Sequence, residues 1–484
     1  MKTFRQTSKQ SGGLFWSGAE RFSVQAIQVI LNIFIARELM PMDYGLIAML
    51  GIFMAIAQSL TDSGISTALI QKKNKTEADF STAFYFNVLI GMAMYAALFF
   101  SASFISAFYA IPQLEAIAKV VGLNIIISSF SVVQRALLAI NFNFRMLFYA
   151  SFAGVMLSGI VGVYLAYSGF GVWALVVQSL ISNLVCTFLL WLFSKWIPKT
   201  GFSFKSFASL FHFGSKLLLS GLLHTIYTNM YTLVIGKKFS ASDLGFYNRA
   251  FSFSSVISAN FTETIARVVY PVQCDLQDND KLLADSFFKY LRQSSWVLFP
   301  LMVGLCVLAK PFVLFALTEK WLFAADLLQI LSLAYMWDTI MRLNYILLNV
   351  KGRTDYTLYS ELIKKCVAVA ILFISIPWGI KAMCWGLLLY SFADIVIVGF
   401  YVERVLPRIT VFKQIKVILP VLVLSIAMGV CVKCASFLFM APFLQLLVGG
   451  IVGILVYGLG SRYIGFDIFR YISKKNDDEH NMCD

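Results

Sequence analysis

The residues with the clearest capacity for chemistry are charged side chains that lie inside long apolar segments of this sequence. A charge at the centre of a lipid bilayer costs about 2.5 to 3.5 kcal/mol, so such residues usually face a polar interior and serve a function. Basic residues outnumber acidic ones in these segments, so a cavity that they share would be cationic and would suit a phosphate-bearing substrate. The candidate anion-binding residues are Arg21, Arg135, Lys216, Arg249, Arg267, Arg342 and Lys364.

The acidic residues and the histidine in the same segments are candidates for coupling transport to an ion gradient. A buried carboxylate can hold a proton, and histidine is the common proton carrier near neutral pH. A structural role stays open for them: a capped or hydrogen-bonded acid explains Asp62 and Asp394 as well, and a lone histidine within a helix is often a packing residue. The ion-coupling candidates are Glu20, Asp62, His224, Asp338 and Asp394.

Some of these charges can be explained by ion pairs within one helix. Glu263 and Arg267 stand four residues apart, as do Asp338 and Arg342, so each pair can neutralise itself on one helix face.

Depth in the bilayer offers a second explanation. Long basic side chains within about three turns of a helix end can reach the lipid headgroups. This applies to Arg135, Lys216, Arg267 and Lys364. Arg21 and Arg342 lie about 15 Å from their predicted helix ends at 1.5 Å per residue, which is too deep for that explanation.

The composition requires a membrane protein. Of the 484 residues, 59% are hydrophobic and 13% are charged, whereas a soluble domain carries about 25% charge. The apolar stretches have the length of spanning helices, about 20 residues, and not that of barrel strands, about 10. The formal charge of +14 is spread over short segments between them, so it indicates topology and no nucleic-acid partner is expected.

The apolar segments predict about fourteen transmembrane helices. An even number places both termini on one side, and the excess of lysine and arginine on that side predicts that it is the cytoplasm. The N-terminal segment is predicted to be a retained helix and not a signal peptide, since Glu20 and Arg21 interrupt it. The segments fall at about 12–36, 44–70, 80–108, 115–140, 146–167, 172–194, 214–236, 244–269, 287–309, 323–349, 356–376, 382–402, 414–434 and 440–463.

An internal repeat predicts two lobes. The run from Ile35 to Gly45 recurs about 200 residues later from Ile235 to Gly245, and Thr61-Asp62 recurs as Thr262-Glu263. A duplicated six-helix unit of parallel topology would be related by a pseudo-two-fold axis along the membrane normal, with substrate between the halves. The predicted parts are an N-terminal lobe at 1–195, a cytoplasmic linker at 196–213, a C-terminal lobe at 214–404, two added helices at 405–463 and a cytoplasmic tail at 464–484.

Catalysis and cofactors find little support in the sequence. Cys431 and Cys434 form one isolated pair without nearby histidines, a weak signal for zinc or redox chemistry. The sequence has no Gly-x-x-x-x-Gly-Lys-Ser/Thr loop, which excludes an ATP-driven pump of that type. We therefore expect no catalytic residue, no metal and no cofactor.

Several short motifs resemble the Wzx-like polysaccharide transporters of the multidrug, oligosaccharidyl-lipid and polysaccharide exporter superfamily. The resemblance covers nearly the whole chain. It rests on Gly13, Phe15, Trp16, Ser17, Ala36, Arg37, Glu38, Leu39, Pro41, Asp43, Tyr44, Gly45, Asp62, Gly64, Ala68, Leu69, Ile70, Gln71, Lys320, Trp321, Lys351 and Gly352. The resemblance implies two six-helix lobes plus two helices. It also implies an inner-membrane flippase of bacteria that moves an undecaprenyl-pyrophosphate-linked repeat unit for O-antigen, capsule or exopolysaccharide.

The resemblance implies that basic cavity residues engage the pyrophosphate. We expect the protein to be a monomer. Its further expected partners are membrane lipids and the polymerase and export machinery of the same pathway. The alternatives are a lipid-linked peptidoglycan-precursor flippase and a drug or cation antiporter of the same superfamily, although an antiporter would need an acidic cavity. A membrane glycosyltransferase or polymerase is the least favoured, because no loop is long enough to hold a catalytic domain.

Overall fold

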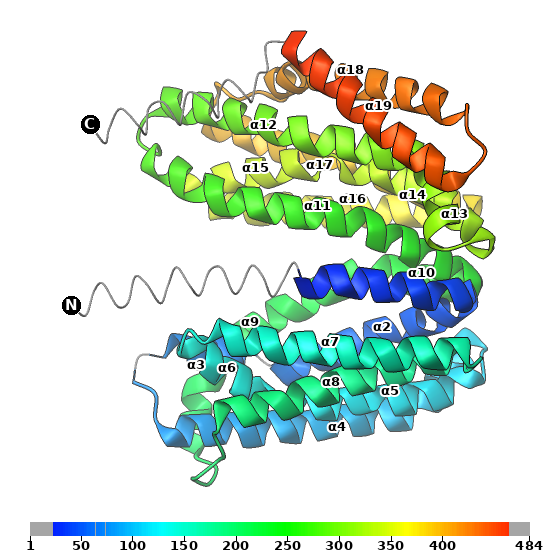
Figure 1. Cartoon of the computed structure of the whole chain (residues 1–484). Coiled ribbons are helices and arrows are strands. Elements are labelled where there is room, and N and C mark those ends of the chain that lie inside the picture. The colour runs from blue at the N-terminus through cyan, green and yellow to red at the C-terminus, as the bar shows by residue number, and fades with distance from the viewer. Residues whose placement is uncertain (1–22, 63, 73, 464–484) are drawn as a thin grey trace, which may run out of the picture. The chain divides into compact units, whose positions relative to one another are not determined.

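The chain is helical throughout the residues that the computed structural model describes, which are 23–62, 64–72 and 74–463 (Figure 1). In one helix, α9, five side chains are outside this description: His212, Phe213, Lys216, Leu217 and Ser220. The predicted all-helical membrane class is thereby confirmed.

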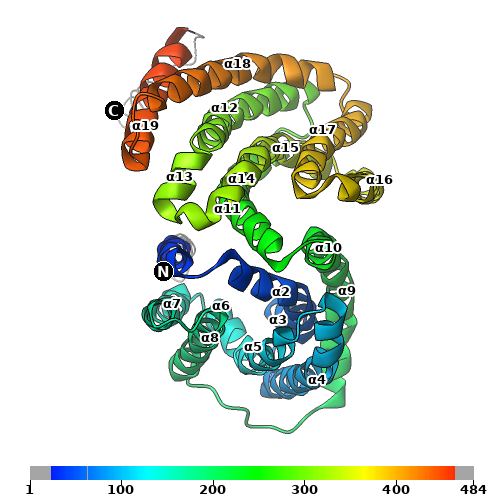
Figure 2. The same ribbon diagram turned by 90° about the vertical axis from the view of Figure 1, so that its right-hand side faces the viewer.

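Contacts between helices divide the chain into two units, residues 1–248 and residues 249–484. In the first unit α7 packs along α8, and α4 packs along α5 (Figure 2). Helical residues 23–38 are followed by α2 (Pro41–Asp62), α3 (Ile65–Gln71), α4 (Glu77–Tyr109), α5 (Gln113–Ser129), α6 (Val132–Ile140), α7 (Phe144–Tyr167), α8 (Val172–Ser194), α9 (Phe204–Thr228) and α10 (Met230–Lys238). Helix α11 (Ala241–Asp275) begins in the first unit and continues into the second.

The second unit surrounds an apolar core in which Phe287, Phe299 and Leu347 are fully buried. Helix α12 packs against α18 and α14, and α16 packs against α17. The elements are α12 (Asp280–Val307), α13 (Ala309–Ala316), η1 (Glu319–Trp321), α14 (Leu322–Tyr335), α15 (Asp338–Val350), α16 (Thr354–Ser375), η2 (Ile376–Trp378), α17 (Ile380–Val405), α18 (Val411–Ser436) and α19 (Pro442–Tyr463).

Among the described residues, 8 helices are long and apolar enough to cross a membrane, or up to 9 if α12 and α13, which meet at 69°, form one bent span. Every apolar segment predicted from sequence coincides with a described helix or a broken pair of helices, the first of them only over 23–38. Several of the other predicted segments are too rich in charge to be counted among these spans. Helix α16, for example, carries Glu361, Lys364 and Lys365 within little more than one turn. The number fourteen and the topology stay a prediction.

Five of the predicted segments are interrupted between described helices, and two of the interruptions are Phe130–Ser131 between α5 and α6 and Met336–Trp337 between α14 and α15. A break frees backbone carbonyls, which must find donors when no water is present. Trp191 Nε1 donates to the carbonyl of Phe130 at 2.9 Å. Side chains of α11 and α17 provide the equivalent bonds at the second break.

At that second break, Ser258 Oγ lies 3.0 Å from the carbonyl oxygen of Tyr335, and Ser391 Oγ lies 3.1 Å from that of Ala334. Hydroxyl groups from neighbouring helices therefore lie beside the backbone where α14 ends, although the one proton of Ser258 is shared between Tyr335 and Asp338.

The sequence repeat is matched by local structure at equivalent positions. Asp43 accepts a hydrogen bond from the backbone N–H of Met40 at 2.9 Å, and Asp243 accepts one from Ser240 at 3.2 Å. Both carboxylates lie in the first turn of their helix, where they complement the helix dipole.

The grouping of helices differs from the lobes expected from sequence. Helix α9, which covers most of the predicted segment at 214–236, packs on α2, α3 and α4 of the first unit. The division falls within α11, between Asn248 and Arg249, and not at the expected linker. Which helices contact one another does not reveal which helices arose by duplication. The organisation into six, six and two helices therefore stays a prediction.

The first turns of α2 and α11 cross at two repeat-related glycines. A Cβ atom on Gly45 would overlap the carbonyl oxygen of Ala241, and one on Gly245 would overlap that of Pro41. Each glycine thus faces the residue four positions before the other, so the contact is reciprocal. Glycine is required at both positions because backbone atoms cannot move aside as a flexible side chain can.

We predict that Gly45→Ala and Gly245→Ala each lower the stability of the protein, by about 1–3 kcal/mol from overpacking. Gly51 is the matched control, because it lies in the same helix α2 and its added Cβ would meet nothing within 4 Å. Thermal unfolding of the purified protein in detergent measures the difference. Equal midpoints for Gly245→Ala and Gly51→Ala would contradict the close crossing.

Candidate functional site

A cavity of about 320 Å³ in the second unit brings together two of the predicted anion-binding arginines. Arg267 lies on α11 and Arg342 on α15, and Glu263 on α11 stands with them. The remaining lining is mixed aromatic and polar: Ala266, Tyr270, Pro271, Tyr345, Ile346 and Asn349.

The carboxylate of Glu263 forms ion pairs with both guanidinium groups. Arg342 donates to Glu263 Oε2 at 3.1 Å, and Arg267 Nε lies 3.6 Å from Glu263 Oε1. The three side chains keep 49%, 60% and 39% of their surface exposed for Arg342, Arg267 and Glu263. A guanidinium has five N–H donors, so these contacts with Glu263 engage only a minority of the donors of each arginine.

The charge balance of this cluster favours an anion. Two cations and one carboxylate leave one net positive charge in the cavity. Exposed ion pairs contribute only about 0–1 kcal/mol, so an anionic ligand can displace the carboxylate. Phosphate groups suit this arrangement because arginine offers two parallel donors to two oxygens.

Of the two same-helix ion pairs expected from spacing, one is present in the structure and the other is not. The pair Glu263–Arg267 is confirmed. The pair Asp338–Arg342 is wrong: Arg342 reaches across to Glu263 on α11 instead.

Asp338 has a different environment from the one expected. It is the first residue of α15, directly after the break, and its Oδ2 accepts a hydrogen bond of 2.6 Å from Ser258 Oγ. A carboxylate at a helix N-terminus is favoured by the helix dipole. The break thus gives Asp338 a structural partner, and its role in ion coupling stays a prediction.

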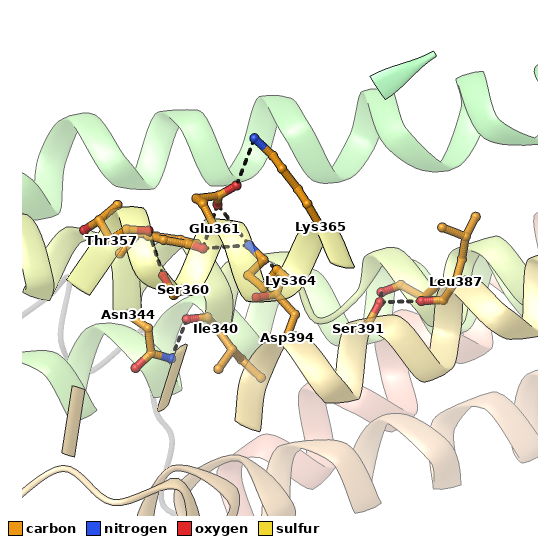
Figure 3. Close-up of polar contacts among 12 residues, drawn as sticks. Ile340, Asn344, Thr357, Ser360, Glu361, Lys364, Lys365, Leu387, Ser391 and Asp394 are labelled. Atoms are coloured by element: carbon orange, nitrogen blue, oxygen red, sulfur yellow. Dashed lines mark hydrogen bonds and ion pairs between the residues drawn. The ribbon is translucent and has the colours of Figure 1, made fainter. Parts of the chain in front are cut away.

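Lys364 and Asp394 form a buried ion pair between α16 and α17 (Figure 3). Their charged atoms lie 3.1 Å apart, and their side chains are only 7% and 5% exposed. Lys364 Nζ also donates to Tyr345 Oη at 2.7 Å and to Glu361 Oε1 at 3.1 Å. The hydroxyl of Tyr345 in turn donates to Glu361 at 2.7 Å.

These contacts use all three donors of the Lys364 ammonium group. Lys364 therefore has an ordered internal environment, and a role as a pyrophosphate ligand would require it to leave these partners. That role stays a prediction. Asp394 Oδ1, in contrast, is buried with no hydrogen-bond partner among the described residues.

A second cavity, of about 510 Å³, lies in the first unit and contains Asp62 of α2 and Arg135 of α6. Gln58 donates to Asp62 Oδ1 at 3.2 Å, and Arg135 donates to Cys186 Sγ at 3.2 Å. Both candidates thus face a polar cavity, as intramembrane charges are expected to do.

The other predicted residues are dispersed. Arg249 is buried with its guanidinium carbon 5.7 Å from the centre of the Trp321 ring, a cation–π distance. His224 is exposed on α9. Glu20, Arg21 and the side chain of Lys216 lie outside the described residues.

Sequence reasoning missed the uncharged members of these sites. Tyr345, Ser258 and Gln58 each bind one of the charged candidates directly. A signal was available, because a polar side chain in a membrane helix usually bonds a neighbouring helix. The identity of the partner helix required the fold.

Comparison with known proteins identifies the family and agrees with the fold. A family model described as "Polysaccharide biosynthesis protein" matches residues 34–326. The lipopolysaccharide biosynthesis protein WzxC of Escherichia coli (strain K12) is 24% identical over 435 residues, 88% of each chain. The teichuronic acid biosynthesis protein TuaB of Bacillus subtilis (strain 168) is 24% identical over 361 residues, 73% of this chain and 74% of that protein.

Among solved structures, the lipid II flippase MurJ in its inward closed conformation has the same fold, with a TM-score of 0.75 and 16% identity over 94% of this chain and 99% of that one. The chain thus shares the helical, multi-pass membrane fold of that protein. The chain belongs to the polysaccharide biosynthesis protein family, and the Wzx-like assignment made from the sequence is confirmed. It is a transporter and not an enzyme.

We predict that breaking the buried pair destabilises the protein strongly. Lys364→Met leaves Asp394 buried without its counterion, which costs about 3–5 kcal/mol, whereas the double variant Lys364→Met, Asp394→Leu regains most of that loss. Unfolding in detergent, by heat or denaturant, measures both.

The matched control is the exposed pair Lys381–Asp326, with charged atoms 2.6 Å apart and both side chains 51% exposed. Lys381→Met should change stability by no more than about 1 kcal/mol. A double variant at Lys364 and Asp394 that is less stable than the single variant would contradict the pairing.

Proposed function

We propose that this protein is a flippase for a lipid-linked oligosaccharide, an undecaprenyl-pyrophosphate-linked repeat unit of O-antigen, capsule or exopolysaccharide. The names of two relatives, for lipopolysaccharide and teichuronic acid biosynthesis, support a role in surface polysaccharide assembly. The substrate would cross the bacterial inner membrane from the cytoplasm to the periplasm.

The observation that carries this proposal is the cluster of Arg267, Arg342 and Glu263 in the second unit. A polyprenyl lipid and a neutral sugar offer no group that needs two arginines. A pyrophosphate does, because it presents several charged oxygens to planar donors. A drug cation would be repelled by the same cluster, which disfavours the antiporter alternative.

In this mechanism the Glu263 carboxylate occupies the arginines whenever the pyrophosphate is absent. When the pyrophosphate enters, it replaces the Glu263 carboxylate on the arginines. When it leaves, the carboxylate returns and neutralises them. The empty carrier then avoids the cost of moving two unpaired cations through an occluded state.

The movement would be alternating access between two lobes of six helices with two further helices, about fourteen spans in all and both termini in the cytoplasm. The lipid tail would stay in the bilayer while the headgroup passes through the protein. Arg21, Lys216 and Arg249 remain part of the proposed cationic path. Lys364 would join it only by leaving its three internal partners. Arg135 faces the separate cavity of the first unit.

An ion gradient would drive the cycle through one of the acidic candidates. Asp394 is the best placed among the described residues, because its Oδ1 is buried and has no hydrogen-bond partner there. A proton or a small cation would satisfy that oxygen. Glu20, Asp62, His224 and Asp338 are the other candidates.

We predict that the double variant Arg267→Ala, Arg342→Ala fails to restore transport. The gene is deleted, and variants are tested for surface polysaccharide and for accumulated lipid-linked saccharide. Loss of hydrogen bonds to a charged group costs about 1.5–3 kcal/mol each, so surface polysaccharide should fall at least about tenfold.

Lys381→Ala is the control for that experiment, because it removes an exposed cation whose ion pair lies outside the cavity. It should restore wild-type surface polysaccharide. Full rescue by the double arginine variant would remove the proposed function.

A separate prediction concerns Glu263. Glu263→Gln removes the competing charge, so the purified protein should bind undecaprenyl pyrophosphate roughly two- to fivefold more tightly. Transport should nevertheless slow, because the arginines lose the group that displaces the product. Weaker binding by this variant would show that Glu263 does not compete with the substrate.

A further inference from the structure

The cavity of the first unit differs in chemistry from the arginine cluster of the second. It encloses about 510 Å³, within the range of small-molecule sites. One acid and one base line it, so its net charge is zero. Its polar lining includes Gln58, Asp62, Ser128, Ser131, Arg135 and Asn183.

A fixed chain of hydrogen bonds orients the Asp62 carboxylate. Ser128 Oγ donates to Gln58 Oε1 at 3.0 Å, and Gln58 Nε2 donates to Asp62 Oδ1 at 3.2 Å. Gln58 and Asp62 share α2, and Ser128 comes from α5. Among the described contacts, Asp62 Oδ2 has no partner, so this oxygen can accept hydrogen bonds from a ligand.

Arg135 is positioned by a weak partner. Its Nη2 donates to the Cys186 thiol of α8 at 3.2 Å. Sulfur is a poor acceptor, so this contact orients the guanidinium while competing little with a ligand. Among the described ion pairs none joins Arg135 to Asp62, although both line the cavity.

A second polar chain supports the wall of the cavity. Asn183 Nδ2 donates to Asn124 Oδ1 at 2.6 Å, and Asn124 Nδ2 donates to Ser179 Oγ at 3.0 Å. These bonds fix the Asn183 amide between α8 and α5. The cavity therefore offers oriented acceptors and donors in a neutral setting.

We propose that this cavity is a subsite for a neutral sugar ring of the substrate, which Asp62 and Arg135 recognise through neighbouring hydroxyl groups. A carboxylate accepts hydrogen bonds from hydroxyls, a guanidinium donates to their oxygens, and a hydroxyl does both. A sugar bearing adjacent hydroxyls can thus bridge the acid and the base. This inference rests on the proposed function, since it assigns the saccharide part of the same substrate.

The same features exclude other ligand classes. A pyrophosphate would face the Asp62 carboxylate with only one arginine to balance it. An organic cation would face Arg135. A hydrocarbon tail would leave oriented amide, hydroxyl and charged groups without partners, which is costly.

Binding to two lipids separates recognition of the sugar from recognition of the phosphate. The probes are undecaprenyl pyrophosphate without sugar and the saccharide-bearing lipid extracted from the deletion strain. Purified protein in nanodiscs is titrated with each. Asp62→Asn and Arg135→Gln should weaken binding of the saccharide-bearing lipid by roughly 5- to 30-fold and leave binding of the bare lipid unchanged.

Two control variants show whether a change in affinity is specific to this cavity. Glu115→Gln alters an exposed acid of α5 that pairs with Lys119 at 2.7 Å, outside this cavity, and should change neither affinity. Arg267→Ala with Arg342→Ala should weaken binding of both lipids. Asp62→Asn is nearly isosteric, so it carries the test if Arg135→Gln does not fold.

The possible results are distinguishable. A loss confined to the saccharide-bearing lipid supports the subsite. An equal loss for both lipids, or no loss for either, overturns it while the proposed function stands. If the wild-type protein binds neither lipid, the proposed function fails, and the subsite fails with it.

Discussion

A charge inside an apolar helical bundle must be paired or must face a polar cavity, and this constraint organises both units of the protein. Lys364 and Asp394 satisfy it by pairing, buried between α16 and α17. Arg267 and Arg342 satisfy it by facing a cavity, held by one shared carboxylate. The first group stabilises the fold, and the second leaves donors for a substrate. The proposed function depends on this difference between two kinds of intramembrane cation.

The helix breaks serve the same constraint. Each break frees carbonyl groups, and serine and tryptophan side chains from neighbouring helices bond them. The break before α15 also places Asp338 at a helix N-terminus, with Arg342 one turn further on. The break therefore begins a new helix, and that helix carries Arg342 into the lining of the cavity.

Much of this could be predicted from the sequence. Long apolar segments located the helices. The excess of cations within those segments is the sequence feature on which the proposed anionic substrate rests, and that substrate stays a prediction. The i to i+4 rule correctly paired Glu263 with Arg267 and failed for Arg342, because spacing describes one helix face and not the neighbouring helix. Asp394 lacked a visible partner for the same reason, since Lys364 lies on another helix. The breaks at Phe130–Ser131 and Met336–Trp337 were also missed. Serines surround the first break, but a serine is tolerated inside a membrane helix and does not by itself predict a break. Neither residue at the second break is glycine or proline.

The most direct test of the account is a structure of the protein in a lipid nanodisc with its saccharide-bearing lipid bound. The account predicts that phosphate oxygens lie within hydrogen-bond distance of Arg267 and Arg342, with Glu263 displaced from at least one of them. A bound substrate whose phosphates lie elsewhere, with the Glu263 ion pairs intact, would contradict it.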